Sequence, residues 1–107
     1  SVSTDCPDKD AFGLELRGDS MEPKFSPGDV LILMPESEPR AGSLVVLRLN
    51  EGDVLFKLFN SGASNDDLVT LTSFNPAYAA IPVRRKEIQW VYPVYEVLRK
   101  TWEGPVL

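Results

Sequence analysis

Turn-forming residues divide this chain into short segments, and their spacing limits what the chain can fold into. The 107 residues include nine prolines and seven glycines. From about residue 12 onward Pro, Gly, Asn and Asp recur between short apolar runs. Runs of this length are typical of strands, and the turn residues between them interrupt helices. We therefore expect a mostly β fold in a single domain, with no helix beyond one turn near residues 21–25.

The expected strands follow from apolar alternation and from β-branched content. Residues 13–17 alternate apolar and polar side chains, as a half-buried strand does, whereas residues 30–34 are apolar throughout. The sequence Asn50-Glu51-Gly52-Asp53 separates two apolar runs and predicts a hairpin. The expected strands are residues 13–17, 30–34, 44–49, 54–59, 68–71, 81–83 and 88–98.

Composition excludes several classes of function. The formal net charge is -5 and the isoelectric point about 4.6, whereas phosphate binding needs a basic surface. The one basic cluster, Arg84-Arg85-Lys86, is most simply a solvated turn. No apolar run approaches the length of a membrane span. A single cysteine, Cys6, cannot form an internal disulfide, which favours a cytoplasmic location.

The first eleven residues are polar and carry little periodic signal. We expect residues 1–11 to be an arm or residual linker and residues 12–107 to form the folded domain. The chain opens on Ser1 rather than Met, which suggests a cut inside a longer protein.

Ser20 lies in the turn-forming sequence Gly18-Asp19-Ser20 and is the candidate nucleophile. A serine hydroxyl needs a neighbouring base to take its proton. The chain contains no histidine, so a Ser-His-Asp triad within it is excluded, and a neutral lysine amine is the remaining common base. On a turn, the backbone N–H groups of Asp19, Ser20 and Met21 could stabilise an oxyanion. An ordinary turn explains the same three residue types, so both interpretations remain open.

Lys57 is the candidate base because it interrupts the apolar run Val54-Leu55-Phe56-Lys57-Leu58-Phe59. In a strand this lysine shares a face with Leu55 and Phe59, and the opposite face is apolar too. Burial disfavours the charged form and lowers the pKa of a lysine, so a neutral amine could act as general base. The alternative is an edge-strand lysine whose stem covers apolar surface while its ammonium reaches water.

No metal or cofactor site is expected. The carboxylates of Asp19, Glu22 and Asp29 are not clustered as metal ligands are and are most simply turn residues. Aromatic residues in the last segment could form a core or an interface. Our candidate dimer surface is the stretch 90–102, with Trp90, Tyr92 and Tyr95 as its main residues and Trp102 near its end.

The order of these motifs resembles the LexA/UmuD/phage-repressor family of self-cleaving proteins. The similarity covers nearly everything from Phe12 to Leu98, and the turn before Ile81 is especially similar to lambda-type phage repressors. The residues that carry the resemblance are Gly18-Asp19-Ser20-Met21, Pro27-Gly28-Asp29-Val30-Leu31, Gly42-Ser43-Leu44-Val45-Val46, Phe56-Lys57-Leu58, Asn75-Pro76-Ala77-Tyr78 and Ile81-Pro82.

The resemblance implies the all-β fold that this family shares with signal peptidases, with Ser20 as nucleophile and Lys57 as general base. Family members cut an Ala-Gly or Cys-Gly bond in a linker upstream of this domain, in cis, when an activated RecA filament stabilises the cleavable conformation. The domain also dimerises, so that upstream helix-turn-helix domains occupy paired operator half-sites. No Ala-Gly or Cys-Gly pair precedes Ser20 in this chain. We therefore expect a C-terminal repressor fragment that lacks its DNA-binding domain and scissile bond.

Three other functions remain open at this point. The domain could be a pure oligomerisation module that does not cleave, or a UmuD-like accessory subunit of a translesion polymerase. A signal-peptidase relative that acts in trans is the least favoured, because it would need a membrane anchor.

Overall fold

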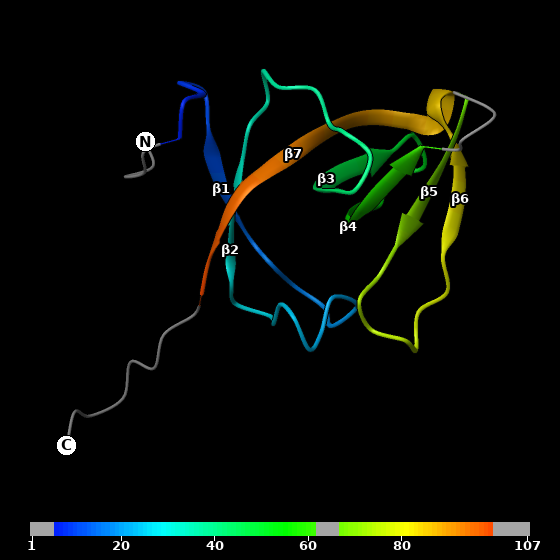
Figure 1. Ribbon diagram of the computed structural model, residues 1–107, viewed down its shortest axis with the longest axis horizontal. Helices are drawn as coiled ribbons and strands as arrows, with labels where there is room; N and C mark the ends of the chain where they lie inside the picture. Colours follow the sequence, from blue (N-terminus) through cyan, green and yellow to red (C-terminus); the bar gives the residue numbers. More distant parts are fainter. Residues whose placement is uncertain (1–5, 62–66, 100–107) are drawn as a thin grey trace.

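Seven strands pair in antiparallel fashion into a curved sheet in the computed structural model, which describes residues 6–61 and 67–99 (Figure 1). The order across the sheet is β1-β2-β7-β3-β4-β5-β6. One 3₁₀ turn, η1 (Arg85–Glu87), precedes the last strand. The strands are β1 (Phe12–Glu15), β2 (Val30–Leu33), β3 (Ser43–Leu49), β4 (Val54–Ser61), β5 (Leu68–Thr72), β6 (Ile81–Arg84) and β7 (Ile88–Leu98).

The mostly β architecture expected from the sequence is confirmed, with small differences at strand ends. The first strand ends at Glu15 rather than at residue 17. The cause is local: the Leu16 N–H donates to the carbonyl of Asp29 at 2.7 Å, and the Leu16 side chain turns into the core. Residues 21–25 form a single turn closed by a hydrogen bond from Phe25 N–H to the Met21 carbonyl. The basic cluster at residues 84–86 is exposed, as expected of a solvated turn.

β7 joins the two halves of the sheet. It pairs with β2 from Val94 to Leu98 and with β3 from Ile88 to Pro93, so the last strand in the sequence lies near the middle of the sheet. Figure 1 shows it crossing from β1 and β2 to the group formed by β3–β6. None of the described residues forms a helix long and apolar enough to cross a bilayer.

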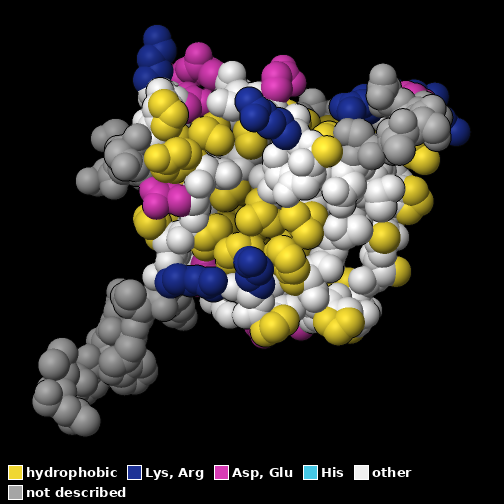
Figure 2. Space-filling view, in the orientation of Figure 1, with side chains coloured by type: hydrophobic (Ala, Val, Ile, Leu, Met, Phe, Trp, Pro, Cys, Tyr) yellow, Lys and Arg dark blue, Asp and Glu magenta, His cyan; other side chains and the backbone are white. Residues whose placement is uncertain are grey.

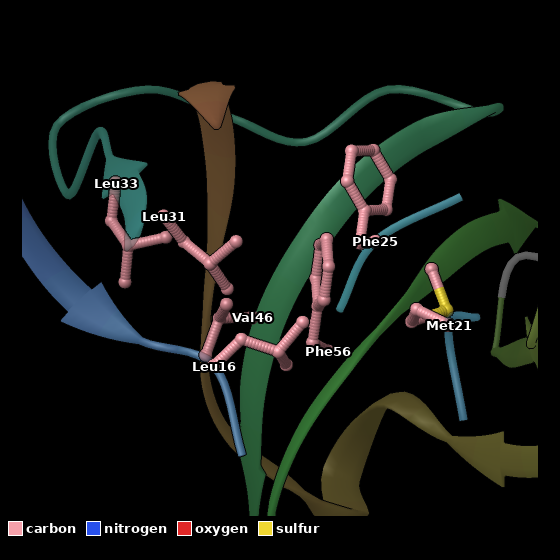
Figure 3. Close-up of a cluster of buried hydrophobic side chains, with 7 residues drawn as sticks. All are labelled: Leu16, Met21, Phe25, Leu31, Leu33, Val46 and Phe56. Carbon is pink, nitrogen blue, oxygen red and sulfur yellow. The ribbon is translucent and has the colours of Figure 1, made fainter. Parts of the chain in front are cut away.

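Two buried clusters hold the fold together, one on each face of β3. Val46 belongs to the first cluster, whereas its neighbours Val45 and Leu47 belong to the second, because successive side chains of a strand point to opposite faces. The first cluster is shown in Figure 3 and consists of Leu16, Met21, Phe25, Leu31, Leu33, Val46 and Phe56. The second consists of Val45, Leu47, Phe59, Val69, Leu71 and Val83.

Candidate active site

The turn that carries Ser20 follows β1 and is fixed by two buried side chains. Gly18 adopts φ +82°, a left-handed conformation that favours glycine, and starts the turn. Met21 and Phe25 are 1% and 6% exposed and reach into the first cluster beside Phe56 (Figure 3). With these anchors buried on its C-terminal side, Ser20 itself stays half-buried.

Lys57 lies inside β4 and is only 4% exposed. It pairs with Val45 of β3 on one side, whereas on the other side β5 pairs with β4 only from Leu58 onward. The lysine therefore sits where β4 loses one of its two neighbours. Both faces of the strand are apolar at this point, as the sequence predicted.

The amine of Lys57 contacts a hydroxyl and an aromatic ring. Its Nζ donates a hydrogen bond to the Ser73 hydroxyl at 2.7 Å and lies 5.3 Å from the centroid of the Tyr78 ring. No salt bridge involves Lys57 within residues 6–61 and 67–99. Burial lowers the pKa of Lys57 below its ordinary value, because desolvation penalises the ammonium. The structure thus gives this lysine the dry surroundings that a neutral amine needs.

Ser20 and Lys57 line the same cavity, whose volume is about 340 Å³. Much of the remaining wall is apolar and comes from residues such as Leu16, Val46 and Phe56. Among the described residues, no hydrogen bond joins the Ser20 hydroxyl to Lys57 Nζ. The fold therefore brings the two candidates to one cavity, and the hydrogen bond of Lys57 Nζ goes to Ser73.

Three backbone N–H groups of the serine turn remain available. The N–H groups of Asp19, Ser20 and Met21 take part in no hydrogen bond within the part of the chain that the structure describes. By contrast, the carbonyl of Asp19 accepts from Glu22 N–H at 3.1 Å, which closes the turn. Unused donors beside a serine are the groups that could bind a developing oxyanion.

The connection between β5 and β6 holds the serine turn from outside, a role that sequence analysis missed. Asn75 donates its backbone N–H to the carbonyl of Ser20 at 3.0 Å and its Nδ2 to the carbonyl of Asp19 at 3.1 Å. The Tyr78 hydroxyl donates to Asp19 Oδ1 at 2.5 Å, and this carboxylate raises the pKa of Tyr78. Figure 1 shows the β1–β2 connection, which carries Ser20, beside the β5–β6 connection at the lower edge of the view. The sequence did predict a compact turn here but gave no sign of what it contacts.

The three aromatic residues proposed for a dimer surface do not share one environment. The rings of Trp90 and Tyr92 are half-buried and stacked, with centroids 4.8 Å apart, and Tyr92 also meets Phe12 edge-on. Tyr95 is 37% exposed, and Leu98 nearby is 43% exposed. Trp102 lies outside the described residues. The first two aromatics therefore contribute to the core, and Tyr95 is the outward one.

An acidic cluster lies away from the cavity, where the N-terminal arm meets the loop after β2. The carboxylates of Asp8, Asp10 and Glu36 lie within 4.8 Å of one another, and Asp8 accepts a hydrogen bond from Glu36 N–H. A hydrogen bond and the charge of Asp10 raise the pKa of Glu36. The cluster shows that residues 6–11 contact the domain, and the boundary at residue 11 stays a prediction.

Comparison with known proteins identifies the family of this chain. The family model described as Peptidase S24-like matches residues 2–94. The LexA repressor of Carboxydothermus hydrogenoformans is 36% identical over 81 residues, which make up 75% of this chain and 39% of that protein. The chain thus spans well under half the length of this relative. It belongs to the Peptidase S24-like family, the LexA-type self-cleaving proteins that its motifs resemble.

Proposed function

We propose that this domain is a serine autopeptidase in which Ser20 is the nucleophile and Lys57 the general base. One observation carries the proposal: Ser20 and Lys57 line one cavity, and this buried lysine has no acidic partner among residues 6–61 and 67–99. A buried lysine without a charged partner costs stability, and groups with perturbed pKa values cluster at functional sites. A lowered pKa is also what a base at neutral pH requires.

The reaction follows from these positions. The neutral amine of Lys57 takes the proton of the Ser20 hydroxyl as its oxygen attacks the scissile carbonyl carbon. The free N–H groups of the serine turn stabilise the oxyanion, and Lys57 then returns the proton to the departing amine. In the second step Lys57 takes a proton from water, and the water oxygen attacks the resulting ester. Lys57 then gives this proton to the Ser20 oxygen, which restores the serine.

The substrate we propose is a linker of the same polypeptide, upstream of this domain, and the parent protein is a phage- or prophage-type transcriptional repressor of the cytoplasm. An activated RecA filament stimulates the cleavage by favouring the conformation in which the linker enters the cavity. The net charge of -5 is consistent with contact to operator DNA through a separate N-terminal domain rather than through this one.

The proposed role in the parent protein includes homodimerisation through the exposed side of β7. Tyr95→Glu places a charge on this surface, away from the cavity, and should weaken self-association measured by analytical ultracentrifugation. Unchanged self-association of a folded Tyr95→Glu variant would place the dimer surface elsewhere.

A second candidate function is a repressor oligomerisation domain that does not cleave. It is favoured by the hydrogen bond of Lys57 Nζ, which goes to Ser73 and not to Ser20. A UmuD-like accessory subunit of a translesion polymerase is the remaining alternative from the sequence, and a parent with a helix-turn-helix domain would exclude it.

The deciding experiment uses a protein in which this domain follows its own upstream linker. It is incubated at alkaline pH, with and without activated RecA, beside Ser20→Ala and Lys57→Ala variants. We expect two fragments from the parent, formed faster as pH rises because Lys57 loses its proton, and none from either variant. Intact chains in every sample would instead establish the non-cleaving function.

A further inference from the structure

Ser73 directly follows β5 and lies opposite Lys57 of the neighbouring strand β4. Leu58 of β4 pairs with Thr72 at the end of β5, so one step further along this antiparallel register Lys57 faces Ser73. Side chains directly opposite each other on one face of an antiparallel pair come within contact distance. The 2.7 Å hydrogen bond from Lys57 Nζ to the Ser73 hydroxyl is this cross-strand contact.

The hydroxyl matters because the amine has few other partners. Within the described ranges, Ser73 supplies the one hydrogen bond that Lys57 Nζ makes, and the centroid of the Tyr78 ring lies 5.3 Å from this atom. Tyr78 is also the titratable group beside it, and its hydroxyl is directed to Asp19. A free amine at the end of four rotatable bonds has many orientations, and a base must present its lone pair to the proton it removes.

We infer that Ser73 is a positioning residue of this site: its hydroxyl accepts one N–H of Lys57 and so orients the amine toward the cavity that contains Ser20. Ser73 does not line that cavity, so it acts through the lysine and not on a substrate. The inference rests on the proposed function, and it adds a third side chain that neither the motifs nor the family match assigns.

The same connection also fixes the other half of the site. Two residues after Ser73, Asn75 holds the carbonyls of Asp19 and Ser20, and Tyr78 holds the Asp19 carboxylate. One short segment thus contacts the lysine at its beginning and the serine turn further along. Displacement of this segment would alter the separation between nucleophile and base, and misplacement by about 1 Å can cost about 100-fold in rate.

The first test measures how fast a fluorophosphonate probe labels the 107-residue chain across a range of pH. In this reaction the Ser20 oxygen bonds to phosphorus, fluoride leaves, and Lys57 takes the proton. We expect Ser73→Ala to lower the labelling rate at alkaline pH about 10- to 100-fold, and Ser73→Thr, which keeps a hydroxyl, to restore most of it. The matched control is Thr72→Ala, which removes a neighbouring hydroxyl whose partner is Asn60 and should label like wild type.

The second test needs no reaction. The titration of Lys57 is followed by NMR of its side-chain carbon next to Nζ in the same four proteins. A hydroxyl that accepts from the ammonium favours the charged form, so Ser73→Ala should lower the pKa of Lys57 further, whereas Ser73→Thr and Thr72→Ala should not. Thermal unfolding confirms that each variant is folded.

The outcomes separate the two proposals. Wild type that never labels at Ser20 contradicts the autopeptidase, while the Lys57 titration still decides the role of Ser73. Labelling of Ser20 together with an unchanged rate and an unchanged Lys57 titration in Ser73→Ala overturns the inference alone. Probe found on Ser73 by mass spectrometry would make Ser73 the nucleophile and overturn both.

Discussion

The turn that carries Ser20 and the strand that carries Lys57 are held in place by different means. Two buried anchors, Met21 and Phe25, and the hydrogen bonds of the β5–β6 connection fix the turn. The lysine is fixed by pairing with β3 and by apolar packing on both faces of β4. A few side chains therefore determine the position of the Ser20 hydroxyl, whereas the packing of the sheet determines how far the Lys57 amine is shielded from solvent.

The strongest test of this difference removes an anchor of the turn. Met21→Ala leaves a cavity in the first cluster, and we expect it to lower the free energy of unfolding by about 2–5 kcal/mol. Urea unfolding followed by circular dichroism measures the loss. A smaller loss, below about 1 kcal/mol, would show that the β5–β6 connection can hold the turn without its anchor.

A change at the strand should have the opposite sign. Lys57→Met keeps the apolar stem and removes the buried charge, so it should raise the free energy of unfolding at neutral pH while abolishing cleavage. Urea unfolding of both proteins at neutral pH measures this gain.

The pH dependence of this gain follows from the lowered pKa of Lys57. Between that lowered pKa and the ordinary value of 10.5, the unfolded chain binds the proton and the folded chain does not. The wild-type protein therefore gains stability from this group as pH rises through that window, and the advantage of Lys57→Met should shrink toward pH 10.5. An advantage that grows with pH would contradict a buried, depressed lysine. Unfolding by urea at a series of pH values gives both curves.

The smallest expected effect concerns the contact between the two regions. Tyr78→Phe keeps the ring beside Lys57 and removes the hydroxyl that bonds to Asp19. Because this bond is exposed, the variant should lower the free energy of unfolding by much less than Met21→Ala does, as measured by urea unfolding. Asp19→Ala should cost a similar amount, and the double variant little more than either one. Additive losses would show that the hydrogen bond does not contribute in solution.

The local features of this molecule could be predicted from its sequence. The seven strands appear where alternation and turn residues placed them, and the last strand, Ile88–Leu98, matches in full. The burial of Lys57 also followed from local pattern, because apolar residues on both sides of a strand leave a lysine no exposed face. These properties depend on neighbours within a few positions along the chain.

The contacts that assemble the candidate site could not be predicted in the same way. No motif in the sequence marks Ser73 as a site residue, because its hydrogen bond to Lys57 depends on the register between β4 and β5. Asn75 and Tyr78 meet the serine turn across more than 50 residues of chain. The stacking of Trp90 on Tyr92 likewise depends on how β7 lies in the sheet, whereas the sequence alone favoured a core position for most of these rings and left an interface open.

The visible face of the space-filling view carries an apolar patch with basic side chains beside it. Figure 2 shows apolar side chains gathered at the centre of the visible face, with basic side chains along the lower margin of the patch. Some basic groups of this molecule do lie over aromatic rings: Lys24 over Phe74 at 5.2 Å and Arg99 over Phe25 at 5.1 Å. Such contacts let a cation cover apolar surface near the serine turn without burying its charge.

The central place of β7 also has a consequence for the order of events during synthesis. The β1–β2 pair joins the rest of the sheet through β7, which leaves the ribosome after all the other strands. The hairpin of β3 and β4 can form earlier, but it then presents the lysine without a docked serine. Under the proposed function, the serine turn and the lysine therefore belong to one complete sheet only after β7 has been made.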